Sequence, residues 1–343
     1  MLRLIYGLSG GMHLVIVKEV GERRVIEAIR QELIFPRAPI PFGDDVSGVE
    51  IERNKVAVLK TDMLVGKTDI PHGMSFWQAG RKAVVMNVSD FAAKGVKPLA
   101  VLVSLGVPPS FLEKDVVQLA RGLNVGAREY GAYILGGDTG EASDLVISCS
   151  LFGLGERMLI PLRSDARAGD VVAVTGFFGK SAAGLKLLSR GISASKSFSK
   201  VFLDAVLLPK ARLKEGLALA KAKVVSGSID SSDGLAWSLY EIAKASHVGF
   251  FIDNLPVAPE VSQFAKRNQL DPLELALYGG EEYELVLTIK PRFWKKALRI
   301  VNQVGGSLLR IGEVTEKTDM VLRWNGKTVA IEPKGWEHFK SRA

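Results

Sequence analysis

Five short motifs of this 343-residue chain set aspartates beside small or turn-forming residues. They are Gly43-Asp44-Asp45, Lys60-Thr61-Asp62, Asn87-Val88-Ser89-Asp90, Gly136-Gly137-Asp138-Thr139 and Asp230-Ser231-Ser232-Asp233-Gly234. Small residues let the backbone approach a ligand closely. Carboxylate oxygens are the ligands that Mg²⁺ prefers, together with water and the phosphates of a substrate. The pattern therefore predicts a magnesium-dependent enzyme that acts on polyphosphates.

A structural interpretation competes with this one, because a single aspartate in a turn is more often a cap or a turn former than a ligand. The pairs Asp44-Asp45 and Asp230-Asp233 favour the ligand interpretation, since they place carboxylates near one another. Such crowding costs free energy when no cation is present. The structural interpretation holds best for Asp44 and Asp165, which we expect to be plain turn residues.

The bulk properties of the chain exclude several classes of protein. The net charge is +8, but the cations are spread along the sequence, so the excess does not predict a nucleic-acid arm. Attraction of small anionic substrates and simple solubility explain it equally well. The single cysteine, Cys149, excludes an internal disulfide, and we expect it in the core of a strand. No apolar run reaches the roughly 18–20 residues that span a membrane, and we expect a cytoplasmic protein.

Apolar periodicity predicts mixed helices and strands, and so an α/β or α+β protein of two domains. We expect helices over 22–33, 78–94, 111–130 and 235–245, and strands over 55–60, 100–107, 132–135, 145–154, 171–174, 249–252 and 283–289. Thr61-Asp62 and Gly136–Thr139 would then lie where strands end, a common place for ligand groups. A domain boundary is expected near 156–166, and residues 192–208 give no clear pattern.

Three further motifs have two interpretations each. The run Gly176–Ser181 fails as a P-loop because Val174 stands where that motif needs glycine, so we favour close strand–helix packing over a phosphate contact. Glu282 and Glu284 alternate with apolar neighbours and predict a solvated face, which leaves Glu281 as the better ligand candidate. Trp336, beside a glycine, either fills a core or stacks on a flat heteroaromatic ligand.

Together these motifs resemble those of the thiamine-monophosphate kinases, in the same order and over about residues 20–340. They are Gly43–Asp45, Lys60–Met63, Lys82–Gly95, Gly136–Thr139, Val174–Leu185, Ile229–Leu235, Gly279–Leu285 and Ile311–Val314. The resemblance implies the two-domain fold of aminoimidazole ribonucleotide synthetase. Its N-terminal α/β domain, here 18–157, forms a dimeric β-barrel with a second subunit. Its C-terminal α+β domain, here 158–343, closes the active site.

The resemblance also implies the reaction and its residues. Such enzymes form homodimers and phosphorylate thiamine monophosphate to thiamine diphosphate with ATP and several Mg²⁺ ions, without nucleic acid or membrane. By motif, the expected metal ligands are Asp45, Lys60 through its backbone oxygen, Thr61, Asp62, Asp90, Asp138, Asp230 and Asp233. The expected ATP contacts are Gly137, Asp138, Arg163 and Ser232. The expected thiamine contacts are Asp69, Glu281 and Trp336. No catalytic side chain is expected.

Three positions depart from the family pattern. Asp69 stands where some relatives have histidine, Glu282 stands where many have aspartate, and Ser231 replaces an apolar residue. Residues 1–17 lie outside the pattern, and we expect that Met12 is the natural start or that the leader is disordered. Two other functions stay open: another ATP-dependent synthetase or kinase of the superfamily, and a non-catalytic nucleotide or thiamine sensor. The number of retained carboxylates argues against the sensor.

Overall fold

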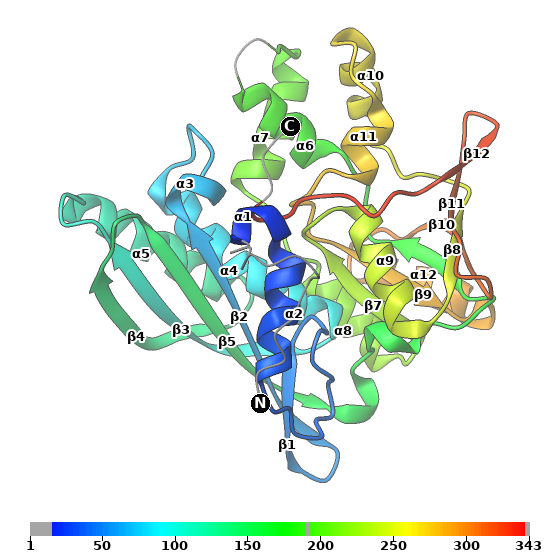
Figure 1. Cartoon of the computed structure of the whole chain (residues 1–343), viewed down its shortest axis with the longest axis horizontal. Coiled ribbons are helices and arrows are strands. Elements are labelled where there is room, and N and C mark those ends of the chain that lie inside the picture. The colour runs from blue at the N-terminus through cyan, green and yellow to red at the C-terminus, as the bar shows by residue number, and fades with distance from the viewer. Residues whose placement is uncertain (1–15, 190–191, 340–343) are drawn as a thin grey trace, which may run out of the picture. The chain divides into compact units, whose positions relative to one another are not determined.

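The computed structural model describes residues 16–189 and 192–339 (Figure 1). The chain falls into two compact units. The first unit comprises the chain up to Pro36 and from Trp336 onward. It contains α1 (Val17–Val20) and the predicted helix α2 (Glu22–Glu32). Within it the backbone N–H of His338 donates a hydrogen bond of 3.1 Å to Oε2 of Glu22. Met12 and the rest of the leader lie outside the described residues.

The second unit, Arg37–Gly335, contains all the other described elements and begins with a five-stranded sheet. Its strands are β1 (Ser47–Glu52), β2 (Lys55–Val65), β3 (Lys97–Val107), β4 (Tyr133–Glu141) and β5 (Val146–Glu156), in the order β1-β2-β5-β3-β4. β4 runs parallel to β3, and the other neighbours are antiparallel. Helices α4 (Phe76–Ala93) and α5 (Glu113–Glu129) pack on one face, and the short α3 (Gly66–Asp69) follows β2.

The seven-stranded sheet of this unit has the order β12-β11-β8-β10-β6-β9-β7. Its strands are β6 (Val171–Val174), β7 (Val225–Ser231), β8 (Gly249–Ile252), β9 (Glu284–Ile289), β10 (Leu309–Thr315), β11 (Met320–Trp324) and β12 (Lys327–Ala330). Val172 and Val174 face α9 (Leu235–Ser246), whereas Ala173 faces the core shared with α8 (Leu213–Lys221) and α12 (Trp294–Gln303). The sheet is thus covered on both faces.

A smaller core joins four short helices of the same unit. They are α6 (Lys180–Leu188), α7 (Lys196–Leu207), α10 (Pro259–Arg267) and α11 (Pro272–Leu277). Short 3₁₀ turns lie at η1 (Arg157–Leu159), η2 (Arg163–Asp165) and η3 (Pro291–Phe293). The first two occupy the segment between the five-stranded sheet and β6, where the sequence predicted a boundary.

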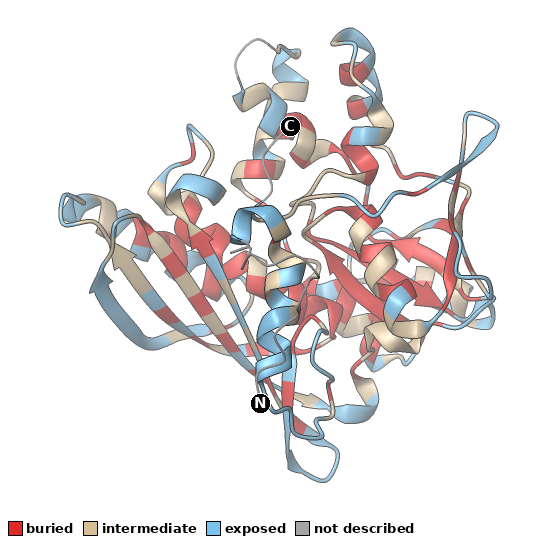
Figure 2. Ribbon diagram, in the orientation of Figure 1, coloured by how far each residue is buried: buried red, intermediate tan, exposed pale blue. Residues whose placement is uncertain are grey.

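Helix α4 is the element that both sheets share. Its N-cap is Ser75, whose side chain and backbone exchange hydrogen bonds with Gln78 in a capping box. From Ala79 to Ala93 every residue except Met86 is buried. The unit has an N-terminal half built on the five-stranded sheet and a C-terminal half built on the seven-stranded sheet, and both halves pack against this helix (Figure 2). Such an element can position side chains toward two sheets at once.

The predicted elements are confirmed in kind, but two strands were predicted too short. β2 continues to Val65, so Thr61 and Asp62 lie inside the strand and not at its end. β4 continues to Glu141, so Gly136–Thr139 is strand and not an exit turn. The sequence pattern missed this because glycines usually interrupt strands. Here a Cβ at Gly137 would lie 1.8 Å from the carbonyl oxygen of Val103, so the close pairing with β3 requires glycine.

The structure also answers three further questions that the sequence raised, about residues 192–208, Cys149 and membrane-spanning helices. Residues 192–208, which gave no clear signal, contain α7, and Ser195 caps this helix by accepting from the N–H of Phe198. Cys149 is buried in β5, as predicted. Within the described ranges, no helix combines the length and the apolar character that a membrane crossing requires.

The close contact of α4 with α5 makes a stability prediction. A Cβ at Gly122 of α5 would lie 1.9 Å from the carbonyl oxygen of Trp77, which belongs to the backbone of α4. We expect Gly122→Ala to lower the free energy of unfolding by roughly 1–3 kcal/mol, because the helices must separate. Urea unfolding measures this change. Gly140→Ala, which meets nothing within 4 Å, is the control, and equal changes in both variants would refute the packing argument.

Candidate active site

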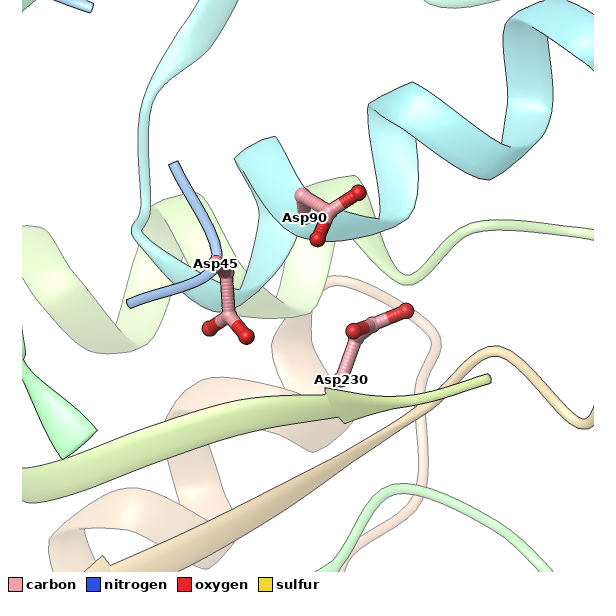
Figure 3. A group of neighbouring side chains, drawn as sticks. All are labelled: Asp45, Asp90 and Asp230. Atoms are coloured by element: carbon pink, nitrogen blue, oxygen red, sulfur yellow. The ribbon is translucent and has the colours of Figure 1, made fainter. Parts of the chain in front are cut away.

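Three carboxylates meet where the two halves of the second unit adjoin (Figure 3). Asp45 precedes β1, Asp90 lies in the last turn of α4, and Asp230 lies near the end of β7. One oxygen from each lies within 4.8 Å of the others, and all three residues are buried. Buried like charges at this spacing repel one another unless a cation neutralises them. Three hard oxygen donors of this kind fit Mg²⁺.

Two cations hold Asp45: Lys94, which is completely buried, and Arg163, which is partly exposed. Lys94 Nζ lies 2.8 Å from Oδ2 of Asp45, and the guanidinium of Arg163 donates to Oδ1, with Nε at 2.9 Å. Burial alone would raise the pKa of Asp45, but Arg163 and Lys94 outweigh it and hold this pKa below its ordinary value. Asp45 is therefore ionised before any metal binds.

Asp44 is more than the plain turn residue that the sequence predicted. Its carboxylate lies 2.6 Å from Nζ of Lys94 and accepts the backbone N–H of Arg163. Asp165, in contrast, accepts from the backbone N–H of Leu162, which is the expected turn role. Because Lys94 is completely buried, Asp44 supplies part of the charge that this ammonium group needs.

Asp90 belongs to a second charged group, formed with β2. Lys60 Nζ lies 3.0 Å from Asp90 and 3.1 Å from Asp62. Burial, followed by the charges of Asp230, Asp62 and Asp45, raises the pKa of Asp90 well above its ordinary value despite this ammonium group. The resemblance assigned Lys60 a backbone oxygen; the structure adds that its side chain balances the carboxylates.

Asp230 is held by a residue of the other half. The Ser89 hydroxyl of α4, itself fully buried, donates a 2.8 Å hydrogen bond to Oδ2 of Asp230. Burial and the nearby charge of Asp45 raise the pKa of Asp230 to about 7. Ser232 and Asp233 occupy the turn that follows. A Cβ at Gly234 would lie 3.1 Å from the backbone oxygens of Tyr278 and Gly279, so this turn runs beside the 279–283 segment.

The structure also joins two of the three expected thiamine contacts. Lys82 of α4 donates to the backbone oxygen of Asp69 at 3.2 Å and forms an ion pair with Glu281. Trp336 belongs to the first unit, and its expected role stays a prediction.

The prediction that Glu282 and Glu284 form a solvated face is wrong. Glu284 is buried, where it binds Arg212 and accepts from the hydroxyl of Thr175. Oε1 of Glu282 accepts from the backbone N–H groups of Gly179 and Ser181, at the first turn of α6. Alternation alone cannot reveal this, because both faces of the central strand β9 are covered. The contacts agree with the packing interpretation of the Gly176–Ser181 run.

Glu282 makes the free energy of unfolding depend on pH. Burial raises its pKa to about 7 from an ordinary value of 4.5, so the folded state holds this proton in a range where the unfolded state has lost it. Stability from this group is complete below pH 4.5 and is lost as the pH rises through 7. Glu282→Gln keeps the acceptor but does not titrate, so its unfolding free energy should rise relative to wild type between pH 5 and 8. Urea unfolding at both pH values tests this, with exposed Glu316→Gln as the charge control; a pH-independent difference would contradict it.

Gly137 and Asp138 lie apart from the carboxylate cluster. β4 is separated from β2 by β5 and β3, which places Asp138 roughly 14 Å from β2. Asp138 pairs with Ser104, which pairs with Ser148, which pairs with Met63, and directly paired residues share a face. Asp138 thus faces away from the side of the sheet that carries Asp62. Within one chain, Asp138 does not join Asp62 or the three clustered carboxylates, and Thr61, which pairs with Ser150, also lies on the face of the sheet that carries Asp138.

The sequence motifs did not indicate which side chains hold the expected ligands in place. They are Lys82 and Ser89 of α4 and Lys94, which caps the C-terminus of this helix, and all three are buried. A signal existed for Lys94, because it directly follows Phe91-Ala92-Ala93 in an otherwise apolar stretch. A charged residue there is either solvated or paired, and only the tertiary structure decides between the two.

Comparisons with known proteins agree with this geometry. Residues 43–156 match the family model of the AIR synthase related protein N-terminal domain, and residues 167–325 match that of the C-terminal domain. The thiamine-monophosphate kinase of Nitrosopumilus maritimus is 37% identical over 297 residues, which is 87% of this chain and 93% of the relative. That of Pyrococcus horikoshii is 40% identical over 301 residues, covering 87% and 91%.

The chain belongs to the thiamine-monophosphate kinase family. Solved structures in this family show the same fold. The structure of AaThiL complexed with AMPPCP and TMP has a TM-score of 0.83 and 31% identity, over 96% of this chain and 100% of that one. The structure of thiamine monophosphate kinase from Aquifex aeolicus has a TM-score of 0.76 and 28% identity, over 89% and 97%. The two-domain fold expected from the resemblance is therefore confirmed.

Proposed function

We propose that this chain transfers the γ-phosphoryl group of ATP directly to thiamine monophosphate, giving thiamine diphosphate and ADP in a Mg²⁺-dependent reaction. Membership of the kinase family makes it a phosphotransferase. The observation that carries the metal dependence is the cluster of Asp45, Asp90 and Asp230. The AMPPCP, an ATP analogue, and TMP in the related AaThiL complex support the two substrates.

The chain's own groups act by position and charge. Donor and acceptor are both phosphates, so their mutual repulsion is the main obstacle to in-line attack. Bound Mg²⁺ supplies the neutralising charge between them. The acceptor oxygen is already anionic near neutral pH, so no residue needs to act as a strong general base. Direct transfer without a phosphoenzyme follows, and a labelled covalent phosphoprotein trapped during turnover would refute it.

The residue roles that we propose follow the family motifs and the contacts above. The metal ligands are Asp45, Lys60 by its backbone oxygen, Thr61, Asp62, Asp90, Asp138, Asp230 and Asp233. The ATP contacts are Gly137, Asp138, Arg163 and Ser232, and the thiamine contacts are Asp69, Glu281 and Trp336. Arg163 already binds Asp45, so it would link the nucleotide to the metal cluster.

A second subunit completes this proposal. The open face of the five-stranded sheet exposes large apolar side chains, including Leu59, Met63, Leu102 and Leu154. Asp138 lies on the same face. Exposed apolar surface of this kind marks protein interfaces. We propose that two such sheets form the dimeric barrel and that each Asp138 serves a site completed by both subunits.

The dimer proposal makes a direct prediction. We expect Leu102→Glu to convert the dimer to monomers and to lower activity, because a charge would enter an apolar interface. Light scattering coupled to size-exclusion chromatography measures the mass. Leu112→Glu is the control, since both leucines are 53% exposed but Leu112 lies at the start of α5. A wild-type monomer, or a dimer that survives Leu102→Glu, would count against the barrel.

The identity of the phosphate acceptor distinguishes the proposed function from its two alternatives. We expect product from thiamine monophosphate and none from thiamine, when each is mixed with ATP and Mg²⁺. Product from a different phosphorylated metabolite alone would indicate another synthetase or kinase of the superfamily. ATP binding without turnover of any phosphorylated acceptor would indicate a sensor.

A further inference from the structure

Three side chains, two of α4 and one of its C-cap residue, cross from the N-terminal half of the second unit to its C-terminal half. Lys82 reaches Glu281, Ser89 reaches Asp230, and Lys94 reaches the backbone oxygen of Ser228. Lys82 and Lys94 are separated by about 18 Å along the helix axis, since each residue adds 1.5 Å. The Lys94 end serves the carboxylate cluster. At the other end, Lys82 contacts the two proposed thiamine contacts Asp69 and Glu281, but its own effect on the reaction has not yet been considered.

Lys82 is placed to act through Glu281 and not on a ligand. Its side chain is 1% exposed, whereas that of Glu281 is 26% exposed. A molecule in solvent can reach the carboxylate but not the ammonium group behind it. The ammonium group also binds the backbone oxygen of Asp69, so one buried cation connects the two residues.

The backbone around Glu281 needs such a partner. Glu281 and Tyr283 have φ values of 64° and 54°, in the left-handed region that costs free energy for residues other than glycine. Their N–H groups donate to the backbone oxygens of Ser232 and Ser231, at 2.6 and 2.9 Å. These bonds fix the backbone of the turn but leave the direction of the carboxylate open. The ion pair with Lys82 sets that direction.

We propose that Lys82 is a positioning residue for substrate recognition, which holds the Glu281 carboxylate beside Asp69 and so forms the subsite for a cationic ring before the substrate arrives. This inference rests on the proposed function, because it takes the thiazolium ring of thiamine monophosphate as the cation. Oε1 of Glu281 binds Lys82, and among residues 16–189 and 192–339 no hydrogen bond engages Oε2, which leaves it for the ligand. Lys82 should therefore affect the phosphate acceptor and leave ATP unaffected.

Steady-state kinetics of Lys82→Met tests this. We expect the KM for thiamine monophosphate to rise roughly tenfold or more, the size expected for a hydrogen bond to a charged group. The KM for ATP should stay within about twofold. Lys67→Met is the matched control, because it removes an exposed lysine two residues from Asp69 and should change neither constant. An unchanged KM for thiamine monophosphate, or an equal rise for ATP, would overturn the proposal.

A double-mutant cycle separates positioning from general damage. In the Glu281→Gln background, Lys82→Met should have little further effect on the KM for thiamine monophosphate, because its target is gone. Additive effects would overturn the proposal. If Lys82→Met folds poorly, Lys82→Gln replaces it in the experiment. This variant keeps a hydrogen-bond donor and should retain part of the affinity for thiamine monophosphate. Wild-type enzyme without turnover of thiamine monophosphate would overturn the proposed function and the inference with it, whereas normal wild-type turnover with an unaffected Lys82→Met overturns the inference alone.

Discussion

Asp90→Asn should lower turnover by on the order of 10²–10³-fold while the protein stays folded. Asp90 contributes one of the three carboxylates that meet within 4.8 Å, and asparagine keeps the shape but removes the charge. In the absence of metal, the substitution relieves repulsion from Asp230, Asp62 and Asp45. Lys60 keeps Asp62 as a partner. We therefore expect an unfolding free energy, measured without Mg²⁺, that is equal to or higher than that of wild type.

The opposite changes in activity and stability make this prediction specific. Steady-state turnover and urea unfolding are measured on the same preparation. Asp204→Asn, at an exposed position of α7, is the control and should leave both unchanged. Near-normal turnover in both Asp90→Asn and Asp62→Asn would remove the metal assignment. A fall in activity matched by a loss of folding would show a structural role instead.

Lys94→Met should have the largest effect on stability, about 3–5 kcal/mol of unfolding free energy. Lys94 is completely buried and lies within 2.8 Å of two carboxylates, those of Asp44 and Asp45. It also donates to the backbone oxygens of Pro161 and Ser228, at 3.2 and 2.7 Å. Methionine fills a similar volume but removes the cation from Asp44, leaves Asp45 with Arg163 alone and leaves the two backbone oxygens without this donor. Urea unfolding measures the loss.

Two further variants test the cause. Adding Asp44→Asn to Lys94→Met should recover part of the lost stability, because one unpaired buried charge is removed. Lys200→Met, an exposed lysine of α7, should change the unfolding free energy by less than about 0.5 kcal/mol. A Lys94→Met variant within about 1 kcal/mol of wild type would show that the network contributes little.

The sequence predicted the elements well where each had one buried face or two clear ends. The helix that carries Asp90 and the strand that carries Cys149 were both found, because apolar spacing depends on local geometry. The pattern failed at β4, where Gly137 is needed for the approach of Val103. It failed again at Glu284, a charge buried in a central strand. In both places the decisive contact comes from a distant part of the chain.

The residues of the candidate site also fall into those that the sequence predicts and those that it does not. Motifs identified the carboxylates, since residue type and neighbours indicate ligand chemistry. They did not identify Lys82, Ser89 and Lys94, whose role depends on the side of α4 that each occupies and on what packs there. Nor did they show that Asp138 faces away from Asp62, because that depends on strand register. Ligands can be predicted from local sequence, whereas their supports require the assembled structure.

The most direct test of the account is a product measurement with metal removal and return. The protein is mixed with ATP, Mg²⁺ and thiamine monophosphate, and thiamine diphosphate and ADP are quantified. We predict equal amounts of the two products, complete loss with EDTA and recovery with excess Mg²⁺. Thiamine diphosphate formed at an undiminished rate in EDTA, or no product from a folded protein that binds ATP, would contradict the central claim that these carboxylates support a metal-dependent phosphoryl transfer.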